Sequence, residues 1–121
     1  MASSTPELIK TAVNHFLEEV PALAKLKLVF ELELQGRGDV QMFRVELPGP
    51  QIAKTVADDA RIRVMMPRAD FNELAEKGTI KGYHDAYDVG HIKVEGDDQI
   101  IKLLAQVIGK REERDHLRKA H

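Results

Sequence analysis

The chain has 121 residues, a formal net charge of −2 and 31% charged residues. This length fits one domain with a sizeable core, and 43% hydrophobic residues argue against disorder. The absence of cysteine excludes disulfides, thiolate metal sites, iron–sulfur clusters and cysteine nucleophiles, and the balanced charge and 5% aromatic residues argue against a nucleic-acid partner.

The N-terminal segment predicts an amphipathic helix. Ser4 and Glu7 have the spacing of a capping box, and Pro6 suits the first turn. Pro21 ends or bends the helix because it has no backbone amide to donate. Apolar residues recur at helical spacing and place one stripe toward a core: Leu8, Ile9, Ala12, Val13, Phe16, Leu17 and Val20.

Two alternating stretches predict an antiparallel hairpin. Residues 26–35 alternate apolar and polar side chains, as in a half-buried strand with Glu31 and Glu33 on its solvent face. Residues 41–47 alternate again, and a turn at residues 35–39 joins the two strands. The inward faces hold Leu26, Leu28, Phe30, Leu32, Leu34, Phe43, Val45 and Leu47.

Two shorter strands and a helix are expected next. A third strand is predicted within residues 51–56 and a fourth at residues 61–66. Pro67 opens a short helix, and Gly78 is well placed to end it in the left-handed region. The inward side chains of the fourth strand and this helix are Ile62, Val64, Met66, Phe71, Leu74 and Ala75.

The C-terminal third predicts a helix, a strand and a final helix. Residues 79–89 favour a short helix with loops, and residues 91–95 favour a strand. Asp97 or Asp98 caps the final helix, whose apolar residues are Ile100, Ile101, Leu103, Leu104, Val107 and Ile108. Together the elements predict an α+β domain over residues 1–121, with a mainly antiparallel five-stranded sheet covered on one face by helices.

A charged tail at about residues 110–121 follows the final helix, with a weak basic excess. Two interpretations stay open: transient contact with an anionic membrane, and a solvated helix end with i,i+4 ion pairs, which we favour. The first residues lack the basic and apolar regions of a secretory signal, and the absence of cysteine fits a reducing compartment. We therefore expect a cytoplasmic protein.

No catalytic or metal-binding pattern stands out in the sequence. His84 and His91 are seven residues apart, a spacing that no zinc motif has. Serine occurs only at positions 3 and 4, without a Gly-x-Ser-x-Gly elbow. We therefore expect no enzymatic activity, no catalytic residue, no metal and no cofactor.

The order of the elements and three short motifs resemble the sterol carrier protein 2 family. The first motif is the strand at residues 60–66, which ends in two methionines, and the second is Asp70-Phe71 in a helix before Gly78. The third is the strand at residues 90–97, which ends in Gly-Asp before an apolar helix. The resemblance extends from about Leu8 to Ile108.

Members of that family fold as a five-stranded sheet covered by helices, and a tunnel between the layers binds sterols, fatty acids or acyl-CoA. The resemblance implies a non-catalytic carrier whose partner is a small apolar ligand of one of these kinds. Tyr83, Tyr87 and His84 are candidates for a hydrogen bond to a polar head at the tunnel mouth. The resemblance implies a tunnel lined by Phe16, Phe30, Val64, Met66, Phe71, Leu74, Ile100 and Leu104.

A second hypothesis is a structural or protein-interaction module that has the same fold and a reduced or lost pocket. Hydrophobic periodicity does not separate a tunnel from an ordinary dry core, so both hypotheses stay open. They differ in cavity volume, because a ligand pocket requires a continuous apolar space of about a few hundred Å³. The sequence identifies no protein partner.

Overall fold

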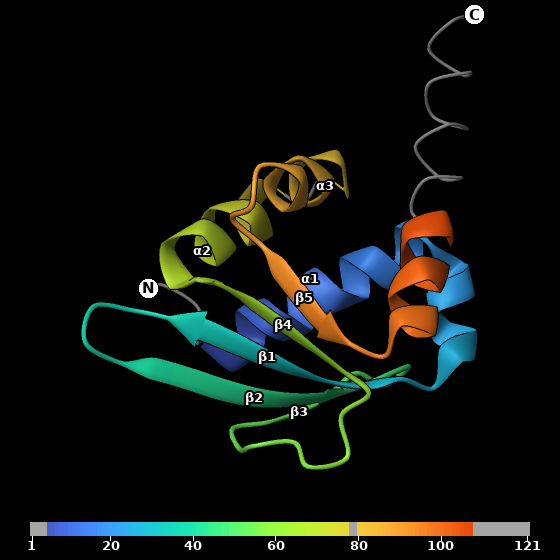
Figure 1. Cartoon of the computed structure of the whole chain (residues 1–121), viewed down its shortest axis with the longest axis horizontal. Coiled ribbons are helices and arrows are strands. Elements are labelled where there is room, and N and C mark those ends of the chain that lie inside the picture. The colour runs from blue at the N-terminus through green and yellow to red at the C-terminus, as the bar shows by residue number, and fades with distance from the viewer. Residues whose placement is uncertain (1–4, 78–79, 108–121) are drawn as a thin grey trace, which may run out of the picture.

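The computed structural model describes residues 5–77 and 80–107. Its elements, shown in Figure 1, are α1 (Thr5–Glu19), η1 (Pro21–Leu26), β1 (Val29–Gln35), β2 (Val40–Glu46), β3 (Gln51–Ala53), β4 (Ile62–Pro67), α2 (Arg68–Lys77), α3 (Ile80–Asp88) and β5 (Lys93–Gly96). A helical segment at residues 98–107 follows β5. The predictions for Ser4, Gly78, Ile108 and the tail at about residues 110–121 lie outside the described residues.

The five strands form one sheet in the order β3-β2-β1-β4-β5. The β1–β2 hairpin pairs Leu32 with Phe43, and the β2–β3 and β4–β5 pairs are also antiparallel. β1 and β4 run parallel, because the chain leaves β3 at one edge and returns on the far side of β1. The α+β prediction with a mainly antiparallel sheet is confirmed, with this one parallel pair added.

The prediction that the first strand begins at Leu26 is wrong. Residues 21–26 form the 3₁₀ helix η1, with Pro21 in its first turn. Lys27 then adopts a left-handed conformation, with φ of 47°, and turns the chain into the sheet. The sequence pattern does not reveal this change. Leu23, in the short helix, and Leu28, just before β1, are both buried, so the burial of leucines does not distinguish the two structures. The third strand is also shorter than predicted and ends at Ala53.

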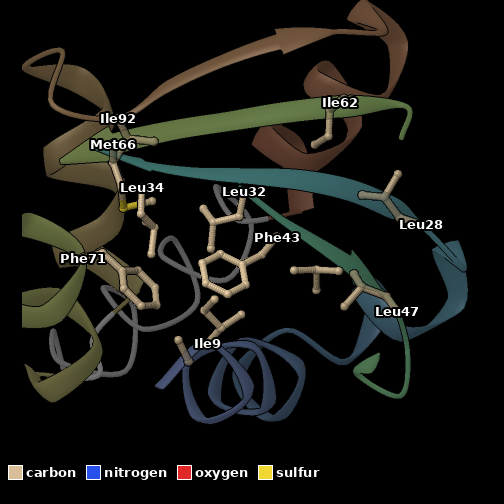
Figure 2. Close-up of a cluster of buried hydrophobic side chains, with 12 residues drawn as sticks. Ile9, Leu28, Leu32, Leu34, Phe43, Leu47, Ile62, Met66, Phe71 and Ile92 are labelled. Atoms are coloured by element: carbon tan, nitrogen blue, oxygen red, sulfur yellow. The ribbon is translucent and has the colours of Figure 1, made fainter. Parts of the chain in front are cut away.

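The core lies between the sheet and the helices. Figure 2 shows Leu32, Leu34 and Phe43 pointing from the sheet toward Ile9 of α1, while Phe71 points in from α2. Phe43 and Ile9 are 1% exposed. Burial of such side chains contributes about 1.5–3 kcal/mol each, and this explains why the apolar stripe of α1 faces the sheet.

Glu31 corrects the prediction that the odd-numbered side chains of β1 face solvent. Its side chain is on the face of the sheet away from the helices, yet the residue is only 2% exposed. The loop between β3 and β4 runs past it, and the Ala57 amide donates a 2.9 Å hydrogen bond to Glu31 Oε2. Arg63 Nε lies 2.8 Å from Oε1 and forms an ion pair without an aligned hydrogen bond.

A row of alternating charges crosses this outer face. Arg44, Glu31, Arg63 and Glu95 are register partners on β2, β1, β4 and β5. Arg44 also binds the loop through Asp59, at 2.6 Å and 3.0 Å, and these bonds hold the pKa of Asp59 below its ordinary value. Opposite charges that face each other across strands stabilise a sheet, so the row fixes both the register and the loop.

Asp97, and not Asp98, caps the helical segment at residues 98–107. Its Oδ1 accepts hydrogen bonds from the amides of Gln99, at 2.9 Å, and Ile100, at 3.4 Å, while Arg61 Nη2 donates to Oδ2 at 2.6 Å. Gly96 before it has φ of +125°, and an added Cβ would lie 2.6 Å from the Arg61 carbonyl oxygen. Only glycine fits this bend without strain.

We expect Asp97→Ala to lower the thermal midpoint by about 2–6 °C, the range for loss of a helix cap. The Arg61 bond first, and then the two amide bonds, lower the pKa of Asp97 below its ordinary value. The carboxylate therefore stabilises the fold above the unfolded pKa of about 3.9 and loses this effect as the pH falls. Wild type and Asp97→Ala should thus converge in acid, whereas Asp98→Ala, the control, should follow wild type throughout.

Candidate functional site

An apolar cavity of about 290 Å³ lies between the sheet and the helices. It is close to the lower end of the range for small-molecule sites and about twice the volume of engineered cavities that bind benzene. The wall residues are Ile9, Ala12, Val13, Phe16, Leu17, Leu23, Leu28, Phe30, Leu32, Leu47, Ile62, Val64, Met66, Phe71, Tyr83, His84, Tyr87, Ile92, Val94, Ile101, Leu104 and Ala105.

The cavity occupies only part of the space between the layers. Over β2, the side chains of Phe43 and Val45 pack tightly, are at most 1% exposed and do not line the cavity. Over β1, β4 and β5, the inward side chains of Phe30, Val64 and Val94 are only partly buried. Their apolar surface faces the hollow. The core on this inner face of the sheet is therefore closely packed over β2 and hollow over β1, β4 and β5.

Three helical pieces contribute most of the cavity wall opposite the sheet. α1 contributes five wall residues at helical spacing, including Ala12 and Phe16. α3 contributes Tyr83, His84 and Tyr87, and the segment at residues 98–107 contributes Ile101, Leu104 and Ala105. The amphipathic pattern that covers a sheet therefore also builds the cavity wall.

The Tyr83 hydroxyl is a buried polar atom without a hydrogen-bond partner among the described residues. Its ring meets the Phe16 ring edge to face, with centroids 4.6 Å apart and planes at 62°. Burial raises the pKa of Tyr83 to about 12, because the ionised phenolate would lose its hydration. Tyr83 is therefore an uncharged hydroxyl at neutral pH, held at the cavity wall by an aromatic neighbour.

Tyr83 should titrate in a step near pH 12 that Tyr83→Phe removes. The chain has only two tyrosines, so the near-ultraviolet absorbance of tyrosinate resolves each of them. Because the folded pKa lies above the unfolded value of about 10, Tyr83 favours the fold below about pH 10 and loses this effect as the pH rises toward 12. Tyr87→Phe is the control; a step near pH 12 that survives in Tyr83→Phe would contradict the assignment.

Comparison with solved structures identifies the architecture. The solution NMR structure of palmitated sterol carrier protein 2-like 2 from Aedes aegypti matches with a TM-score of 0.58 and 24% identity, over 83% of this chain and 93% of that one. Its crystal structure gives 0.54 and 23%, over 82% and 98%. The sterol carrier protein domain 2 of Helicoverpa armigera gives 0.57 and 12%, over 90% and 96%.

The chain has a sterol carrier protein 2-like fold. The resemblance seen in the sequence motifs is thereby confirmed at the level of the fold. No family model matches the sequence, and no curated protein matches it. The similarity is therefore one of three-dimensional fold, and the chemistry of the cavity depends on this chain's own residues.

The structure brings most of the predicted site residues to the cavity wall of this sterol carrier protein 2-like fold. Those on the wall are Phe16, Phe30, Val64, Met66, Phe71, Tyr83, Tyr87 and Leu104. Leu74 and Ile100 are not on the wall and pack as partly buried side chains against the core.

Several wall residues were not singled out from the sequence. The wall also contains Ile9, Ala12 and Val13 of α1, for which the helical spacing predicts only a general core stripe. Ile101 and Ala105 lie on the wall where Ile100 was expected. A helical stripe about 100° wide does not specify which of its members faces a hollow.

The polar residues of α3 lie at the cavity mouth. Tyr87 is 46% exposed, so water satisfies its hydroxyl, and it lies one residue before the exposed Asp88. His84 Nε2 lies 3.5 Å from Asp88 Oδ2, one helical turn away. The Asp88 carboxylate therefore points along the surface of α3 and leaves the wall apolar.

The described residues support no metal site in this sterol carrier protein 2-like fold. They contain no group of three histidine or acidic side chains placed to hold an ion. His91 Nδ1 lies 3.7 Å from Asp70 Oδ2, and His84 pairs with Asp88 on another element. Within residues 5–77 and 80–107, no helix is long and apolar enough to cross a membrane.

Proposed function

We propose that this protein binds and carries a small apolar lipid in the cavity between its sheet and helices, without a catalytic step. The observation that carries the proposal is the apolar cavity of about 290 Å³ in a fold shared with sterol carrier proteins. One of those structures is named as the palmitated form of the mosquito protein, which makes fatty-acid-like chains the first ligands to test.

The cavity favours the carrier over a module that has lost its pocket. A closed module would pack its interior to crystal-like density, and this chain does so over β2 but leaves Phe30 and Val64 facing open space. The described wall contains no carboxylate, serine or lysine that could serve a nucleophile–base pair. A cytoplasmic location and transient membrane contact of residues 110–121 stay predictions.

The proposal predicts how affinity depends on chain length. Each methylene moved from water into the cavity contributes about 0.8 kcal/mol, so affinity should rise about fourfold per added carbon. The rise should stop when the cavity is full, at about ten heavy atoms if each occupies a water-sized share of about 30 Å³. Acyl-CoA and sterol-like ligands are larger than this, so a greater part of each would remain outside the cavity than for a simple alkyl chain.

Calorimetric titration with straight-chain alcohols of increasing length tests the proposal. We expect one ligand per chain, a fourfold gain per methylene and then a plateau, with a negative heat-capacity change that marks apolar burial. The structural or protein-interaction module would be favoured instead if no alcohol binds at ligand concentrations of about tens of micromolar, or if the affinity does not depend on chain length.

A further inference from the structure

The cavity wall carries no permanent charge. Among the described wall residues there is no lysine, arginine, aspartate or glutamate. His84 is the one wall residue that can become a cation, and Asp88 lies 3.5 Å from its imidazole. An ionised head group drawn into this space would lose its hydration without gaining a counter-charge, which is costly.

One wall residue, Tyr83, carries a hydrogen-bond donor that no described group uses. The Tyr83 hydroxyl is buried and has no partner within the part of the chain that the structure describes, whereas Tyr87 at the mouth is open to water. A buried polar group without a partner destabilises the protein, and a ligand that brings an acceptor removes that penalty. The edge-to-face contact with Phe16 holds the Tyr83 ring at the wall, which keeps its hydroxyl beside the space that a ligand would enter.

We propose that the preferred ligand is an uncharged amphiphile, an alkyl chain with a ketone, ester or alcohol oxygen, and that Tyr83 donates a hydrogen bond to that oxygen. This inference rests on the proposed function, because it names the class of lipid that the same cavity selects. It makes Tyr83 a specificity-determining residue, and it ranks carboxylates below uncharged ligands with the same chain.

The test compares ligands that each contain ten carbon atoms and differ in their polar group. Calorimetry at about pH 7.5, where a carboxylic acid is ionised, measures the binding of 2-decanone, 1-decanol, decanoate and butylbenzene, which has no acceptor. The variants are Tyr83→Phe, which keeps the ring and removes the hydroxyl, and Tyr87→Phe, the matched control at the mouth.

We expect wild type to bind 1-decanol at least tenfold more tightly than decanoate. Tyr83→Phe should weaken 2-decanone about three- to tenfold, the effect of one neutral hydrogen bond, and leave butylbenzene unchanged or slightly tighter. Tyr87→Phe should change none of the four affinities.

The inference is overturned, and the carrier left intact, if decanoate binds wild type as tightly as 1-decanol does. It is likewise overturned if 2-decanone binds Tyr83→Phe as tightly as wild type while butylbenzene binds. Equal loss of 2-decanone and butylbenzene in Tyr83→Phe also overturns it, because the ring and not the hydroxyl would then matter. If butylbenzene and all three oxygen-containing ligands fail to bind wild type, the proposed function falls together with the inference.

Discussion

Leu104→Trp should abolish ligand binding and leave the protein at least as stable as wild type. Leu104 lies on the cavity wall in the segment at residues 98–107, and its side chain is only partly buried. An indole at this position extends into the hollow and occupies the space that a ligand needs. Filling a cavity often stabilises a protein, whereas the same change in a close-packed core costs about 1–3 kcal/mol.

The measurement pairs ligand affinity with the urea midpoint in the same variants. Leu103→Trp is the matched control, because it adds the same side chain one residue away at a position that does not line the cavity. We expect Leu103→Trp to bind like wild type. The proposed carrier function would be contradicted if wild type binds no lipid and Leu104→Trp is clearly less stable than wild type. That pair of results would show that the space is closed in solution.

Glu31→Ala should destabilise the protein by about 2–3 kcal/mol. The change leaves the buried Ala57 amide without its acceptor, which alone costs about 1–3 kcal/mol, and removes the anion that Arg63 faces across the strands. Arg63 is 45% exposed and can turn toward water, so the penalty stays below that of an ion pair buried on both sides. Urea unfolding measures the loss, and hydrogen exchange at Ala57 reports the release of the loop.

Two variants separate the role of Glu31 from a general effect of removing a carboxylate. Glu31→Gln keeps an acceptor for the Ala57 amide and loses the charge, so it should cost about 1 kcal/mol. Glu33→Ala removes a partly exposed partner of Gln35 on the same face of β1 and should change stability by less than about 0.5 kcal/mol. Equal costs at positions 31 and 33 would mean that the loop does not depend on Glu31.

The main elements could be predicted from the sequence because local signals agree with the fold. Proline marks both ends of α1, and the hairpin strands alternate in register, so that Leu32 pairs with Phe43. The buried Glu31 could not be found in this way. Alternation places it on the outer face correctly, but it does not show that the loop between β3 and β4 covers that face.

The candidate site was predictable as a set of inward side chains and not as a cavity. Phe43 and Phe30 belong to the same alternating pattern, yet Phe43 is 1% exposed in packed core and Phe30 faces the hollow. The difference arises from how α1 and the segment at residues 98–107 sit over the strands, a long-range property. Likewise, only the three-dimensional structure shows that the Tyr83 hydroxyl has no hydrogen-bond partner among the described residues.

Native mass spectrometry after incubation with a mixture of neutral and acidic lipids tests the central claim, that the cavity holds an apolar ligand, most directly. We predict a one-to-one lipid complex for wild type and Leu103→Trp and only the bare chain for Leu104→Trp. Bare protein in all three samples, or the same lipid complex in Leu104→Trp as in wild type, would contradict the assignment of the cavity as the lipid site.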